Sequence, residues 1–92
     1  MSKITINKKI SYYNKKQYIH ADTIPEKKAD TIDDALEYIK QTPLHYVNNP
    51  QGITAREELY FITGTADHVL KYTKTIDPDT GSERLTTPGG EA

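Results

Sequence analysis

The sequence predicts an α+β domain: an antiparallel sheet of four to six strands with one main helix, at about residues 32–41, packed on one face. Short segments alternate apolar and polar residues, turn residues separate them at hairpin spacing, and one segment has apolar residues at helical spacing. A chain of 92 residues has room for one domain. Residues 1–87 are therefore expected to form a single domain, and residues 88–92 a flexible C-terminal tail.

The N-terminal segment predicts a β-hairpin. Residues 3–13 alternate between an apolar and a polar face, the pattern of an antiparallel strand with one side in water. Residues 14–16 then predict a short hairpin loop, because Asn14 tolerates left-handed backbone. Residues 17–21 are predicted to form the return strand. The polar residues 22–30, which include Pro25, predict a loop. The apolar face of the first strand carries Ile4, Ile6, Ile10 and Tyr12, and Lys8 interrupts it.

The clearest helix signal follows this loop. Thr31 fits an N-cap position, with Asp34 three residues later, and two acidic residues in the first turn suit the helix dipole. Pro43 ends the helix, because the residue before a proline avoids helical backbone. One apolar stripe at helical spacing carries Ile32, Ala35, Leu36 and Ile39.

The second half of the chain predicts further strands joined by turns. Residues 54–57 fit either one helical turn or an irregular lead-in to the next strand. The predicted strands are 44–48, 59–63, 68–76 and 82–87, with turns at 49–52 and 77–81. The predicted core consists of Ile4, Ile6, Ile10, Ile32, Leu36, Ile39, Leu59, Phe61, Leu70, Tyr72 and Ile76.

The net charge of −1 hides an uneven distribution along the chain. Residues 1–28 hold seven lysines against two acidic residues, whereas residues 29–92 hold five basic and eleven acidic ones. This asymmetry favours a basic and an acidic face, unless the two halves neutralise each other within the domain.

Several kinds of site lack their usual signature. There is no cysteine, which excludes disulfides and a cysteine-based zinc site. Together with an opening that lacks a secretory signal and the absence of a long apolar run, this predicts a cytoplasmic protein without a membrane span. The three histidines form no metal motif, and no nucleophile elbow or phosphate loop is present. We therefore expect no catalytic residues, no metal and no cofactor.

The basic N-terminal hairpin is the one segment with a physical function attached. Lysines attract phosphates or acidic surfaces, and tyrosines on a sheet can stack on unpaired bases. Lysines on an edge hairpin also have a simpler role, since they prevent edge-to-edge aggregation. The predicted partner-binding residues are Lys8, Lys9, Tyr12, Tyr13, Lys15, Lys16 and Tyr18.

In size and layout the chain resembles the small phage-encoded anti-CRISPR inhibitors. The likeness consists of the length, the absence of cysteine, the opening Met1-Ser-Lys-Ile-Thr-Ile-Asn-Lys-Lys, the capped helix at Thr31-Ile-Asp-Asp-Ala-Leu-Glu-Tyr-Ile, and the hairpins elsewhere. That class has no common motif, so the resemblance carries over no functional residue. It implies a phage accessory protein that blocks a larger host protein or ribonucleoprotein complex by occupying its surface.

Three functions follow from these observations. The first is a non-enzymatic binding protein that inhibits a larger host complex through the hairpin residues. The second is a small regulator that binds nucleic acid directly through the basic hairpin, with affinity that falls steeply as salt rises. The third is a structural or assembly protein of a phage, which would self-associate. The sequence leaves the partner's identity and the oligomeric state open.

Overall fold

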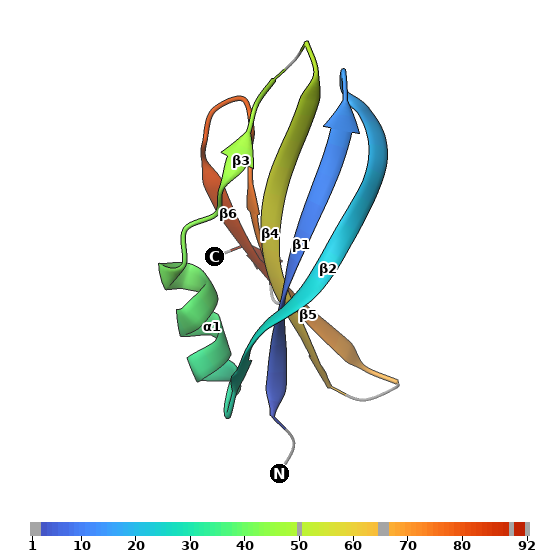
Figure 1. The fold of residues 1–92 in the computed structure, drawn as a ribbon. Coiled ribbons are helices and arrows are strands. Elements are labelled where there is room, and N and C mark those ends of the chain that lie inside the picture. The colour runs from blue at the N-terminus through green and yellow to red at the C-terminus, as the bar shows by residue number, and fades with distance from the viewer. Residues whose placement is uncertain (1–2, 50, 65–66, 89, 92) are drawn as a thin grey trace.

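The chain forms a twisted antiparallel sheet with one helix against one of its faces (Figure 1). The computed structural model describes residues 3–49, 51–64, 67–88 and 90–91. Within these residues, six strands follow one another in the order β2-β1-β4-β5-β6-β7, and a short seventh strand, β3, pairs with β4 beside this path. The α+β class and the antiparallel sheet are thus confirmed. The elements are β1 (Ile4–Asn14), β2 (Gln17–Ala29), α1 (Ile32–Gln41), β3 (Tyr46–Val47), β4 (Ile53–Gly64), β5 (Val69–Ile76), β6 (Glu83–Thr87) and β7 (Gly90–Glu91).

The two faces of the sheet differ in what covers them. We call the side that packs against α1 the helix face and the opposite side the outer face. The helix covers only part of its side, because the β1–β2 hairpin tip and the start of β4 extend away from it (Figure 1). The molecule is accordingly elongated, 47 × 23 × 23 Å along its principal axes.

The core lies between α1 and the helix face. Phe61, Ile6 and Leu59 are fully buried, as the alternation of the strands predicts, and so is Ile39, as the helical spacing predicts. Ile32 was expected in the core but is 38% exposed, because it stands at the first turn of the helix. Ile10 and Leu70, also expected there, are only half-buried. Ala35, from the predicted apolar stripe of the helix, is buried in the same cluster, and so are Ala29 and Leu44, which sequence reasoning missed.

The predicted loop at 22–30 is wrong, because β2 continues to Ala29 as the partner of β1. Pro25 fits in β2 for two reasons. The strand lies at the edge of the sheet. The pairing register also shifts at this point, because Ile6 pairs with Lys27 and Asn7 pairs with Pro25. A proline is tolerated at an edge or bulge, where its missing N–H is not needed for pairing.

Two other boundaries also differ from the prediction. Residues 54–57 are neither a helical turn nor irregular, because they belong to the continuous strand β4. The strand expected at 44–48 is reduced to the two residues of β3. Of the predicted tail, residues 89 and 92 lie outside the described residues, and Gly90–Glu91 pair with β6.

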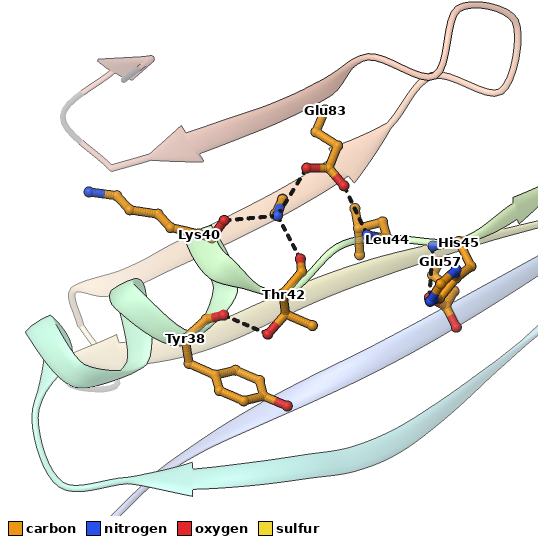
Figure 2. A network of polar contacts seen from close by, with 8 residues as sticks. Tyr38, Lys40, Thr42, Leu44, His45, Glu57 and Glu83 are labelled. Carbon is orange, nitrogen blue, oxygen red and sulfur yellow. Dashed lines mark hydrogen bonds and ion pairs between the residues drawn. The ribbon is translucent and has the colours of Figure 1, made fainter.

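Both ends of the helix are fixed by identifiable groups. At the start, the Thr31 hydroxyl accepts a hydrogen bond from the N–H of Asp34 at 3.1 Å, which confirms the predicted N-cap. At the end, the Thr42 hydroxyl donates to the Tyr38 carbonyl at 2.7 Å (Figure 2). These contacts satisfy main-chain groups that a helix terminus leaves without partners.

A buried lysine of β5 also anchors the helix end to the sheet. The Lys74 ammonium donates to the carbonyls of Lys40 at 3.2 Å and Thr42 at 2.6 Å, and lies 3.1 Å from a carboxylate oxygen of Glu83. The other oxygen of that carboxylate accepts the N–H of Leu44 at 2.9 Å (Figure 2). The hydrogen bond from Leu44 and the contact with Lys74 hold the pKa of Glu83 below its usual range, against the opposing effect of partial burial.

Candidate binding surface

The predicted partner-binding residues do not share one surface. Successive side chains of a strand point to opposite faces, so Lys8 and Tyr12 lie on the helix face, whereas Lys9 and Tyr13 lie on the outer face. The seven residues therefore do not lie together on one face of the sheet. The remaining members are distributed over the hairpin tip, which holds Lys15 and Lys16, and the exposed start of β2, which holds Tyr18.

The helix-face members of the set are engaged within the domain. The Lys8 ammonium lies 3.5 Å from a carboxylate oxygen of Glu26 and 3.6 Å from one of Glu57. The Tyr12 ring stacks on the His20 ring, with centroids 4.8 Å apart. These contacts give both residues a structural role in joining β1 to its neighbouring strands.

Charges of the two sequence halves neutralise each other in part. Lys8 and Lys3 belong to the basic half, and they pair with Glu57 and Asp30 of the acidic half. The lysines at the hairpin tip and at the end of β2 remain exposed.

The outer face carries a cluster that the sequence did not indicate. The Arg56 guanidinium donates a hydrogen bond to the Tyr13 hydroxyl at 2.6 Å, and its central carbon lies 4.8 Å from the centroid of that ring. Tyr18 meets the same ring edge-on, with centroids 5.8 Å apart. The register of β1 against β4 brings Arg56 opposite Ser11, and no local pattern predicts a pairing between segments so distant in sequence.

A groove of about 670 Å³ runs over this outer face. Strands β1, β4, β5 and β6 supply its floor, and the turn between β5 and β6 supplies one wall. Its lining includes both basic and acidic residues, so no single charge dominates the groove. Its lining residues are Lys9, Ser11, Tyr13, Arg56, Glu57, Glu58, Thr75, Ile76, Asp77, Pro78, Asp79, Ser82 and Arg84.

A smaller pocket of about 380 Å³ adjoins the groove and shares Tyr13, Arg56, Pro78 and Asp79 with it. We call it the tip pocket. Its lining residues come from three places besides β1 and β4: the hairpin tip, the turn between β3 and β4, and the turn between β5 and β6. Its lining residues are Tyr13, Lys16, Asn48, Thr54, Arg56, Pro78 and Asp79.

The backbone of the hairpin tip is unusual. Lys15 and Lys16 form the two-residue turn, and both have positive φ angles, 50° and 72°. Asn14, which was expected in this loop as the residue with left-handed backbone, is instead the last residue of β1. Two consecutive positive φ angles define a type I′ turn, which normally selects asparagine and glycine because a Cβ disfavours this backbone. The lysines therefore occupy positions that their backbone preference does not favour.

The polar clusters that could suggest other chemistry have ordinary structural roles. Among the described residues, no group of three or more histidine, aspartate or glutamate side chains is placed to hold a metal ion. The Asp77–Gly81 segment, which loosely resembles a calcium loop, is a hairpin turn: a carboxylate oxygen of Asp77 accepts the N–H of Asp79 at 2.9 Å, and its carbonyl accepts the N–H of Gly81 at 2.7 Å.

The described part of the chain includes no helix of the length and apolarity that crossing a membrane requires. Comparison with known proteins adds no assignment, since no family model, no curated protein and no solved structure matches the chain.

Proposed function

We propose that this protein is a non-enzymatic binding protein that docks onto a larger protein through the outer face of its sheet. The supporting observation is the groove of about 670 Å³ on the face without a helix, lined by side chains of both charge signs. A partner with its own mixed charges complements such a surface, whereas a partner of one charge does not.

The size of the domain is compatible with this role. A specific protein interface needs roughly 800 Å² from each partner. The accessible surface of this chain is 6193 Å². An interface of the usual size would then take about one eighth of that surface, which one side of the sheet can supply. Inhibition of a host complex in the cytosol, as the resemblance to anti-CRISPR proteins implies, is the biological form of this proposal.

Direct binding of nucleic acid is less well supported. A polyanion in the groove would approach Glu58, Asp77 and Asp79, and like charges at short distance repel. The Tyr13 ring, expected to stack on bases, already has the Arg56 guanidinium over it and the Tyr18 ring at its edge. The exposed lysines of the hairpin tip, Lys15 and Lys16, favour nucleic acid. Capture from lysate with and without nuclease separates binding of a protein from binding of nucleic acid.

Tagged protein is used to capture partners from lysate of the host cell, with and without nuclease. The charge reversal Lys9→Glu changes the groove, and Lys28→Glu is the matched control, because Lys28 is exposed on β2 and does not line the groove. We expect the tagged protein to capture one defined protein, with or without nuclease. The Lys28→Glu variant should still capture this protein, and the Lys9→Glu variant should not.

Two results would contradict the proposal. Captured material that disappears with nuclease identifies nucleic acid as the partner. Self-association of the purified protein, without capture of another protein, identifies a structural or assembly subunit.

A further inference from the structure

We infer that the tip pocket binds an acidic segment of the protein partner, with the Lys16 ammonium and the Arg56 guanidinium facing its carboxylates. This inference rests on the proposed function and names the chemistry of the partner at one end of the same face. The pocket brings together two cations from segments forty residues apart in sequence, one from the hairpin tip and one from β4.

The geometry of Arg56 suits recognition of a carboxylate. Its side chain is fixed by the hydrogen bond to the Tyr13 hydroxyl and by its position over the Tyr13 ring. A guanidinium has five N–H donors in a planar fork, so one bond to a hydroxyl leaves others for a carboxylate. Because the side chain is already ordered, binding costs less conformational entropy than ordering a free arginine would.

The pocket rim is also held in place before a partner arrives. The N–H of Lys15 donates to the carbonyl of Gly52 at 3.0 Å, which ties the hairpin tip to the turn between β3 and β4. Across that turn, the hydroxyl of Thr54 in β4 exchanges hydrogen bonds of 3.3 Å with the main chain of Asn49. Lys16 is thus presented from a turn that is itself anchored to the opposite rim.

The turn sequence gives an independent reason to assign a role to these lysines. Asparagine and glycine would form the same turn without the steric cost that the positive φ angles of Lys15 and Lys16 impose. Backbone strain of this kind is found where a side chain is needed for function. Of the two lysines, Lys16 lines the pocket and Lys15 does not.

An acidic protein segment fits the pocket better than a nucleic acid does. Asp79 lines the pocket beside the two cations, and Glu58 follows in the adjoining groove. A protein segment can place a carboxylate at Lys16 and a basic or neutral residue next to these acids. A nucleic acid carries a phosphate at every nucleotide and cannot avoid them.

The test measures binding of a short peptide in which glutamate alternates with serine, called oligoglutamate here, to the 92-residue protein by nuclear magnetic resonance titration. Oligolysine of the same length and a single-stranded oligothymidylate are the comparison ligands. We expect oligoglutamate to shift the amide signals of Lys16, Thr54 and Arg56, and oligolysine to leave them unchanged.

The paired variants Lys16→Glu and Lys15→Glu make the assignment specific. Both change the same charge in the same strained turn, but only Lys16 lines the pocket. We expect Lys16→Glu to weaken oligoglutamate binding at least about tenfold, because a charge-assisted contact is lost and replaced by repulsion. The loss of affinity caused by Lys15→Glu should be several-fold smaller than the loss caused by Lys16→Glu. Tyr13→Phe removes the hydroxyl that positions Arg56. This variant should bind oligoglutamate more weakly, while the amide signal of Lys16 still shifts on addition of the peptide.

The inference is overturned if the two glutamate variants bind oligoglutamate equally, or if oligothymidylate binds more tightly than oligoglutamate. Capture of the partner from lysate separates this failure from that of the proposed function. A partner lost with Lys9→Glu but fully retained by Lys16→Glu leaves the groove as the interface and removes the tip pocket from it.

Discussion

Replacement of Lys74 by methionine tests whether the buried ammonium holds the helix end to the sheet. The residue is 5% exposed, and methionine keeps most of its apolar stem in the core. The change leaves the carbonyls of Lys40 and Thr42 without this donor, at a cost of about 1–3 kcal/mol for each unpaired group. The side chain of Glu83 is 34% exposed and keeps its bond to Leu44, so its loss of a partner adds little.

These contributions predict a loss of about 3 kcal/mol in the free energy of unfolding. For a domain of this size, the melting temperature should fall by roughly 12–24 °C. Lys71→Met is the matched control: it is also on β5, but it is exposed, with its ammonium 5.0 Å from the centroid of the Tyr60 ring. The control should lose no more than about 1 kcal/mol. Equal stabilities of the two variants, measured by urea denaturation, would refute the role given to Lys74.

Three further predictions follow from contacts at the helix and the hairpin. Thr31→Ala removes the N-cap and should cost about 1 kcal/mol in chemical denaturation, and Thr31→Ser should restore most of it. The lowered pKa of Glu83 means that the folded state binds its proton less readily than the unfolded chain, so this group stabilises the fold above its unfolded pKa. That stability is lost as the pH falls through the folded pKa, and Glu83→Gln should flatten the acidic side of a stability–pH curve; an unchanged curve contradicts the assignment. The double change Lys15→Asn with Lys16→Gly should raise stability by about 1–2 kcal/mol, because it relieves the left-handed backbone, and a lower melting temperature would show that the turn is not strained.

Local interactions explain what could be predicted from the sequence. The helix begins at a hydroxyl three residues before an acidic residue and ends before Pro43, and both signals lie within a few residues of the boundaries they set. The alternation of β1 is equally local, because its core side faces the helix while the other side is polar.

Two core-facing lysines were visible in the same patterns. Lys8 interrupts the apolar face of β1, and Lys74 stands between Tyr72 and Ile76 on the apolar face of β5. Each is paired with glutamate in the structure. Their positions signal buried or half-buried charges, although the sequence does not give their partners.

The remaining features depend on distant strands. Most of β2 is exposed on both faces, so its sequence does not alternate between apolar and polar residues. The segment is nevertheless extended, because β1 pairs with it along its whole length. The contact between Tyr13 and Arg56 needs the register of β1 against β4, which is fixed only when the whole sheet assembles. The sorting of the contact residues by face did not depend on it, because the alternation of β1 alone already places Lys8 and Tyr12 opposite Lys9 and Tyr13.

The central place of β4 has a consequence for how the chain folds as it is synthesised. Asn7 pairs with Tyr60 and Asn14 with Ile53, so the inner edge of β1 has its partner only after β4 has been made. The β1–β2 hairpin can close within about 1–10 μs, but an isolated hairpin is only marginally stable in water. Until Tyr60 leaves the ribosome, the nascent chain therefore presents two unpaired strand edges, and lysines on such edges disfavour the addition of other nascent strands.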